Sequence, residues 1–314
     1  MSFFKRTFTI TFCLLLAVCC HLCSQQVKDD TTFRIDTHIH LYDTNRAGSS
    51  IFLDSVIHEK IYYPHLVSEF LEVASPTGVN YAVVVEASKR REDNFWAMDI
   101  VNQSDNMLAF IGNLDPRDAH YIKDLEQLST NKKFRGIRIR PKKKIDIANE
   151  KVIELLGELD KRNLVLELGE NAGPIEAIEI ISRKYPEMNI IIDHMAGGKI
   201  QDGVIVPKGW KKRLEKLEAL PNVYIKISML YFLSGKFPSP TDYKFYKAFI
   251  DQVVDVFGPN RILFGSNWTL SEMGGSYANL IRICNEYLNE KKVVTQKQFY
   301  ADNGIQAFGL EIKK

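Results

Sequence analysis

Short apolar runs alternate along the chain with longer segments whose apolar residues recur at helical spacing. Helices are expected between the runs, for example at 64–74, 151–162, 175–185 and 243–257, and the tail 298–310 resembles a final helix. Strands that alternate with helices form parallel βαβ units. The eight runs expected to be strands are 33–41, 81–88, 108–115, 136–141, 164–169, 190–194, 223–228 and 261–268.

Eight such units predict an α/β fold of one domain, a closed (β/α)8 barrel of the TIM type spanning 31–314. The alternative is an open, doubly wound sheet. That fold normally carries a glycine-rich phosphate loop after its first strand, and this chain has none there. The barrel is therefore the expected architecture.

The first residues have the layout of a secretory signal peptide, predicted at 1–23. Lys5 and Arg6 precede an apolar run at 8–20, which is shorter than the ~20 residues of a membrane-spanning helix. The chain is therefore expected to be secreted or periplasmic, without a membrane-spanning segment. A lipid-anchored form stays open through one of the cysteines that end the run: Cys19, Cys20 or Cys23.

Charge and cysteine content narrow the classes of partner. Removal of the signal leaves 39 basic and 39 acidic residues, so nothing favours nucleic acid or an anionic membrane surface. One cysteine remains, Cys284, which excludes an internal disulfide and a cysteine zinc site. It is expected to be a buried small apolar residue. A small molecule is the expected partner, and the oligomeric state is open.

Alternation along each strand sorts the residues into two faces, one packed on helices and one facing the barrel axis. The apolar positions are assigned to the helices, including Val83 and Val85 of the second run. Most runs then place polar groups inside, near the strand ends: Asp36, His38 and His40; Glu86 and Ser88; Arg138 and Arg140; Glu167; His194; Lys226 and Ser228; Asn267.

His38 and His40 lie two residues apart on one strand, a spacing that suits two ligands of one divalent metal ion. His194 is the candidate third ligand, and imidazole suits zinc, nickel or iron. Glu167 or Glu86 could complete the set, with one position left for water. The histidines at 58, 65 and 120 are expected at the surface or in loops.

The inward Arg138, Arg140 and Lys226 allow two interpretations. They could bind a carboxylate or a developing oxyanion of the substrate. Equally, they could balance Glu86 and Glu167 in a buried network of ion pairs. The sequence leaves both open.

Three segments together resemble the amidohydrolase superfamily. They are Asp36-Thr37-His38-Ile39-His40 on the first strand, Asp193 to Gly198 after the sixth, and Phe264-Gly265-Ser266-Asn267-Trp268 on the eighth. The branch they resemble includes sugar-lactone and pyrone-dicarboxylate lactonases and metal-dependent decarboxylases. The resemblance implies that His38, His40 and His194 bind metal or substrate.

Asn267 departs from the family pattern, which has aspartate there as the base for the attacking water. An amide cannot act as a base, so Glu167 and Glu86 are the replacement candidates. Asn267 could still hydrogen-bond a water molecule or ligate through its carbonyl oxygen. Trp268 and Tyr231 are candidates for stacking on a substrate ring. The expected function is hydrolysis of a small lactone or cyclic ester with an anionic group. The alternatives are a metal-dependent decarboxylase, a metal-free mechanism and a catalytically impaired binding homologue.

Overall fold

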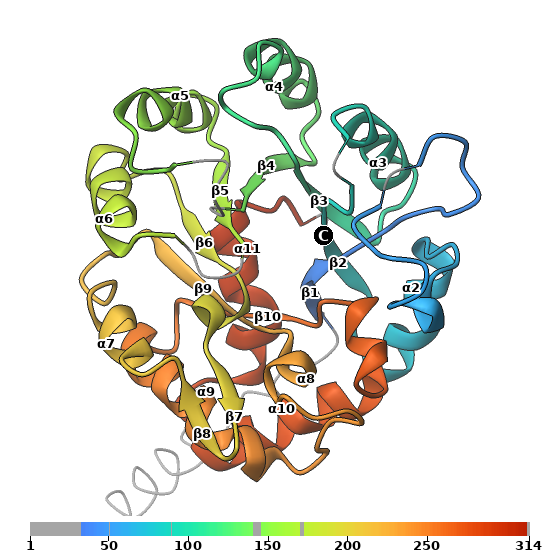
Figure 1. Cartoon of the computed structure of the whole chain (residues 1–314), viewed down its shortest axis with the longest axis vertical. Coiled ribbons are helices and arrows are strands. Elements are labelled where there is room, and N and C mark those ends of the chain that lie inside the picture. Colours follow the sequence, from blue (N-terminus) through green and yellow to red (C-terminus); the bar gives the residue numbers. More distant parts are fainter. Residues whose placement is uncertain (1–32, 50, 89, 141–145, 170–172, 313–314) are drawn as a thin grey trace, which may run out of the picture. The chain divides into compact units, whose positions relative to one another are not determined.

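Figure 1 shows the computed structural model of the protein. It describes residues 33–49, 51–88, 90–140, 146–169 and 173–312, which belong to one compact unit. The predicted signal peptide, with its cysteines, lies outside the described residues. None of the helices in the described part is long and apolar enough to span a membrane.

Eight parallel strands form one sheet in sequence order, with each strand beside the next one of the barrel. The sheet closes between its first and last strands, where His40 N donates to Trp268 O at 2.7 Å and Asn267 N donates to His38 O at 2.9 Å. The predicted barrel is confirmed. Its strands are β1 Ile35–Ile39, β2 Tyr81–Val85, β3 Met107–Gly112, β4 Phe134–Ile139, β5 Val165–Leu168, β6 Ile190–Ile192, β9 Val223–Ser228 and β10 Ile262–Gly265.

Helices form an outer ring around these strands (Figure 1). In α9, Asp242 caps the first turn, and the apolar residues at helical spacing are buried against the barrel. The ring consists of α2 Val67–Ala74, α3 Asp93–Asn102, α4 Tyr121–Ser129, α5 Glu150–Asp160, α6 Ile175–Lys184, α7 Trp210–Glu215, α9 Tyr243–Phe257 and α10 Tyr277–Lys291. Shorter helices are η1 Glu59–Ile61, η2 Ser75–Thr77, η3 His194–Gly197, α8 Leu230–Leu233, η4 Leu270–Met273, η5 Gln298–Asp302 and α11 Asn303–Phe308.

Two face assignments made from alternation are wrong. Val83 and Val85 pack inside the barrel with Ile35. In β1, the pairing with β2 shifts between Asp36 and Ile39, which indicates a bulge, and the Asp36 carboxylate bonds to Tyr277 of the outer helix α10. A bulge inserts one residue and so breaks the two-residue period.

The loop after β6 contains a hairpin that was not predicted, β7 Lys199–Gln201 and β8 Val204–Val206. Asp202 and Gly203 form its turn with positive φ values of 50° and 77°. An Asp-Gly pair between short apolar runs is a strong hairpin signal, so the sequence did contain the information.

Candidate active site

Polar side chains from most of the strands meet at the carboxyl ends of the barrel. The imidazole rings of His38 and His194 have centroids 4.8 Å apart, and those of His38 and His40 are 5.0 Å apart. The structure therefore brings the three predicted histidines together. All three are almost completely buried, and burial lowers their pKa values, to about 3 for His40 and His194.

His38 has one committed and one uncommitted ring nitrogen. Its Nδ1 lies 3.2 Å from Asp193 Oδ1 and 3.1 Å from Lys226 Nζ. Its Nε2 is buried and has no hydrogen-bond partner among the described residues. When Nδ1–H donates to Asp193, Nε2 carries a lone pair that is ready for a ligand.

His40 is fixed on both sides. Its Nδ1 lies 3.0 Å from the carbonyl oxygen of Val85, and its Nε2 lies 3.1 Å from Asn267 Oδ1. Because Nδ1–H donates to Val85, the neutral ring keeps a lone pair on Nε2. The contact with Asn267 is then a hydrogen bond only when the amide turns its NH2 group toward His40.

His194 and Asn267 both follow strands in left-handed backbone conformations, with φ values of 51° and 60°. Residues other than glycine rarely adopt this conformation, and those that do cluster at functional sites. His194 Nδ1 lies 2.8 Å from Ser228 Oγ, and its Nε2 lies 3.2 Å from Arg138 Nη2. The ring is thus oriented by a hydroxyl on one side and a guanidinium on the other.

A buried ion-pair cluster lies around His38. Lys226 Nζ is 2.5 Å from Glu167 Oε2 and 3.2 Å from Asp193 Oδ1, and Arg138 Nε is 2.7 Å from Asp193 Oδ2. Burial raises the pKa of Asp193, but the charges of Lys226 and Arg138 outweigh it and hold the pKa well below 3.8. Burial and the Asp193 charge raise the pKa of Glu167. The predicted network exists, and Asp193 is its unforeseen centre.

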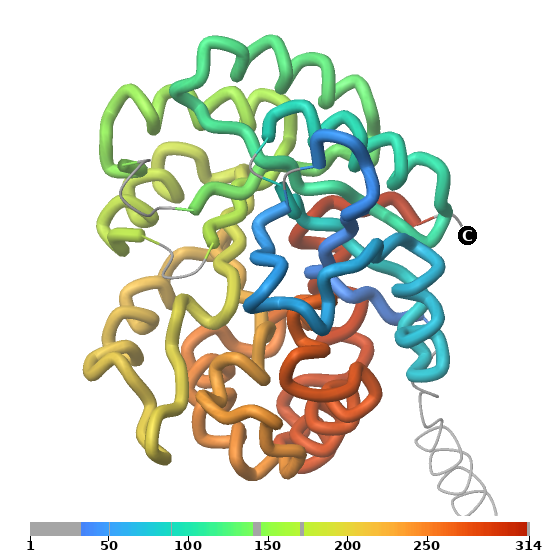
Figure 2. Tube along the Cα trace, turned by 45° about the vertical axis from the view of Figure 1, so that its right-hand side comes forward, coloured from blue at the N-terminus to red at the C-terminus, as the bar shows by residue number. Residues whose placement is uncertain are grey.

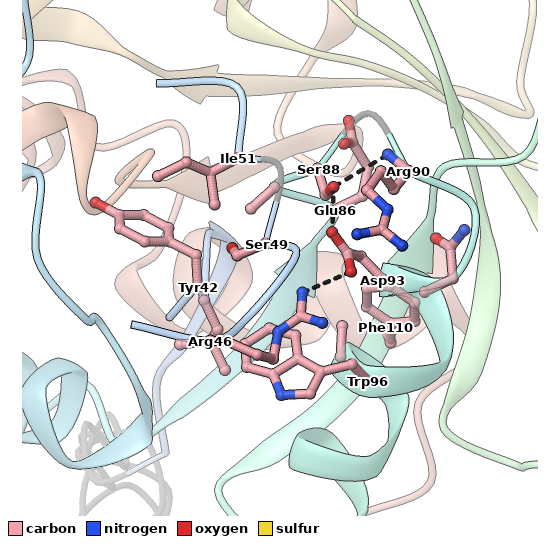
Figure 3. Close-up of a pocket in the computed structure, with 14 residues that line it drawn as sticks. Tyr42, Arg46, Ser49, Ile51, Glu86, Ser88, Arg90, Asp93, Trp96 and Phe110 are labelled. Carbon is pink, nitrogen blue, oxygen red and sulfur yellow. Dashed lines mark hydrogen bonds and ion pairs between the residues drawn. The ribbon is translucent and has the colours of Figure 1, made fainter. Parts of the chain in front are cut away.

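Glu86 joins this cluster to a more open side of the mouth. Its Oε1 lies 2.5 Å from Arg140 Nη1 and 3.5 Å from Arg138 Nη1, whereas its Oε2 has no hydrogen-bond partner in the described part of the chain. Glu86 is 3% exposed and Arg140 is 40% exposed. Burial raises the pKa of Glu86 above 4.5. Glu86 also lines a cavity of about 20 Å³ (Figure 3), which has room for one water molecule.

The three cations that were predicted to bind substrate differ in how exposed their side chains are. Lys226 is fully buried and contacts two carboxylates. Its position favours the interpretation that it balances their charge. Arg138 is 4% exposed and also bonds acids. Arg140 is the one that a substrate at the mouth can reach.

The two aromatic side chains that were candidates for stacking on a substrate ring are packed in the core instead. Trp268 is 1% exposed, packs against Phe70 of α2 and donates from Nε1 to Glu272, so its ring does not face a substrate. Tyr231 is equally buried. His65 lies in a loop as predicted, but it is buried beside Trp268 rather than at the surface. Cys284 is buried as predicted, and burial raises the pKa of its thiol to about 12.

The bulge in β1 is held from outside the barrel by Asp36. Its Oδ1 accepts hydrogen bonds from His38 N at 3.0 Å and Ser266 N at 2.9 Å, and its Oδ2 accepts one from Tyr277 Oη at 2.9 Å. One buried carboxylate therefore fixes the backbone of β1 and of the segment after β10. That segment carries Asn267.

Among the described residues, His38, Asp193 and His194 offer ligand atoms that lie within 4.8 Å of one another. The uncommitted nitrogen in this group is His38 Nε2, and imidazole suits a divalent metal ion. Asp193 already contacts His38 Nδ1, Lys226 and Arg138. His40, which the sequence also predicts as a ligand, is not in this group and stays a predicted ligand. Because Arg138 and Lys226 already contact this set, an ion would bind in competition with two fixed cations.

This donor set makes a prediction about zinc affinity. His38→Gln should weaken zinc binding by at least about tenfold, because it removes a ligand, whereas His40→Gln should weaken it less. Titration of each purified variant with zinc against a chromogenic chelator measures both affinities. Equal losses of zinc affinity in the two variants would show that His40 is a ligand as well.

Similarity to known proteins identifies the family of the chain. A sequence model of the amidohydrolase family matches residues 35–310. The chain belongs to the amidohydrolase family. It is thus a hydrolase by family, and it is similar to an L-fucono-1,5-lactonase of Burkholderia ambifaria, with 26% identity over 251 residues, 79% of this chain and 84% of that protein.

Solved structures share the fold of this amidohydrolase. One is an amidohydrolase from Burkholderia multivorans with bound zinc, with a TM-score of 0.76, 17% identity, and coverage of 89% of this chain and 100% of that one. Another is 2,6-dihydroxybenzoate decarboxylase from Rhizobium, with a TM-score of 0.58, 11% identity, and coverage of 88% and 98%. At these identities the likeness establishes the barrel and not the reaction.

Proposed function

We propose that this amidohydrolase is a lactonase that opens a small sugar-derived lactone bearing an anionic or polar group. The observation that carries the proposal is Glu86, a buried carboxylate at the barrel mouth with one uncommitted oxygen and a partly exposed Arg140 on the other. A base and a cation side by side are what attack of water on a carbonyl requires. The similarity to a lactonase supports the substrate class.

The residues act as follows in the proposed mechanism. Arg140 binds the polar group of the substrate, and the positive charges of Arg140 and Arg138 stabilise the negative charge that develops on the carbonyl oxygen. Glu86 takes a proton from water while the water oxygen bonds to the carbonyl carbon. The ring C–O bond then breaks, and Glu86 returns the proton to the leaving oxygen. The product is a hydroxy acid, which releases one proton at neutral pH.

Asp193, Lys226 and Glu167 lie deeper and are proposed to hold His38 in place rather than to react. A divalent ion bound by His38 Nε2 and His194, with Asp193 orienting His38, would polarise the lactone carbonyl as a Lewis acid. We also propose that the enzyme works outside the cytoplasm, on the basis of the signal peptide predicted at 1–23.

A panel of sugar lactones in weakly buffered pH indicator tests this function, since each turnover releases one proton. We expect hydrolysis of at least one five- or six-membered lactone, with one oxygen-18 atom from labelled water in the product. Release of carbon dioxide without that label would select the decarboxylase alternative. A well-folded protein that turns over no lactone, ester or amide would contradict the proposal.

Asn267→Asp distinguishes a working variant site from an impaired one. An aspartate would face the lone pair of His40 Nε2 and favour protonation of that ring, which disturbs the site. We therefore expect kcat/KM to fall by about tenfold. This is the change in an equilibrium that corresponds to a shift of one pKa unit in the His40 ring. A gain in hydrolysis would instead indicate a disabled hydrolase.

A further inference from the structure

An aromatic side chain lies against the candidate histidines without any role so far. The ring of Phe52 packs edge-on against the imidazole of His40, with centroids 5.1 Å apart and planes at 68°. Phe52 is partly buried, and it also packs against the apolar cluster of Tyr42, Leu53, Ile61 and Ala87. Among the ring contacts of the described residues, it is the one aromatic side chain other than histidine that touches His38, His40 or His194.

The backbone holds Phe52 in this position. Its N donates to Ala87 O at 3.0 Å, and Ile51 forms an antiparallel bridge with Ser88. Earlier in the same loop, Arg46 forms an ion pair with Asp93 at 2.5 Å and stacks over the Trp96 ring, as Figure 3 shows. Figure 2 shows the loop, in blue, lying beside α3. Two anchors thus hold the loop that carries Phe52.

The chemistry of the mouth makes this ring distinctive. The groups of the mouth described above are imidazoles, carboxylates, guanidiniums and an amide, all of which bind the polar atoms of a sugar. A phenyl ring offers no hydrogen bond, so a hydroxyl pressed against it loses its partners, whereas a methyl group buries apolar surface there. A ring in this place therefore separates substrates by the group that faces it.

We propose that Phe52 is a specificity-determining residue that selects a lactone with a methyl group over one with a hydroxymethyl group at the ring carbon. This inference rests on the proposed lactonase function. It adds a named residue and a chemical criterion, because the polar groups of the site bind both substrates alike.

The test compares a 6-deoxyhexono-lactone with the matching hexono-lactone. Wild type should favour the deoxy lactone by about 10- to 100-fold in kcat/KM, the range that one small apolar contact achieves. Phe52→Ser should bring that ratio below about threefold, and Phe52→Leu should keep most of it. Val56→Ser is the matched control in the same loop, since Val56 is 82% exposed; it should leave the ratio unchanged.

A second measurement does not depend on turnover. The two hydroxy acid products are titrated into each variant by calorimetry, and wild type should bind the deoxy acid more tightly, with the preference lost in Phe52→Ser. Selective binding that depends on Phe52, without hydrolysis of any lactone, would support the role of Phe52 and sink the lactonase proposal. Equal handling of both substrates by wild type, or a ratio that Phe52→Ser does not change, would overturn the inference while hydrolysis itself stands.

Discussion

Glu86→Gln is expected to lower kcat for lactone hydrolysis by about 100- to 10,000-fold, the usual contribution of a general base. Glutamine keeps the shape of the side chain but cannot accept the proton from water. Steady-state assays on the same lactone give the ratio. The matched control is Glu92→Gln, at a side chain that is 57% exposed on the same side of the barrel; its kcat should stay within about twofold.

The pH profile adds a second signature for Glu86. Burial raises its pKa, so the carboxylate that must be ionised to act as a base becomes protonated at a pH above 4.5. Activity of the wild type should therefore fall as the pH drops through that raised pKa, and the residual activity of Glu86→Gln should lack this acid limb. A variant with an unchanged acid limb and a tenth or more of the activity would exclude Glu86, and Glu167 would be the next candidate.

Lys226→Met should lower the free energy of unfolding by about 3–5 kcal/mol, the cost of removing one partner from a buried charge cluster. Methionine fills a similar volume, but Glu167 and Asp193 lose the ammonium group that lies 2.5 and 3.2 Å from them. Urea unfolding followed by circular dichroism measures the change. Adding Glu167→Gln to Lys226→Met should recover part of the loss, because it removes one of the unpaired charges.

An exposed ion pair provides the control for Lys226. Lys216 and Glu176 form a pair at 2.9 Å with side chains 56% and 67% exposed. Water screens such pairs, so Lys216→Met should cost less than about 1 kcal/mol. If Lys226→Met cost no more than Lys216→Met, the buried cluster would not be holding the barrel together.

Much of the barrel was predictable because the interior of a parallel sheet needs a run of apolar residues in every strand. The segment 190–192 is a plain example. Side-chain direction was predictable only where the two-residue period holds. It failed at Asp36, where a bulge intervenes, and at Val83 and Val85, where both barrel faces are apolar and the pattern carries no direction.

The histidines of the site were predictable because metal and catalytic chemistry uses few residue types at characteristic spacings. Asp193 precedes His194 at the end of β6, yet its central position in the ion-pair cluster depends on how four strand ends pack, which no local pattern specifies. The exposures of Arg140 and Lys226 depend in the same way on depth along the barrel axis. The position of Phe52 could not be predicted for a related reason. It lies in a loop, where no periodic pattern indicates which residue comes to lie against His40.

The seam between β1 and β10 has a consequence for how the enzyme is made. The hydrogen bonds that close the barrel come from the backbone of the same segments that supply His38, His40 and Asn267. During synthesis, a nascent chain that has not yet reached residue 267 has neither a closed sheet nor the contact between His40 and Asn267. Active-site assembly and ring closure should therefore coincide as one late event, and a ribosome-stalled fragment ending before β10 should be inert.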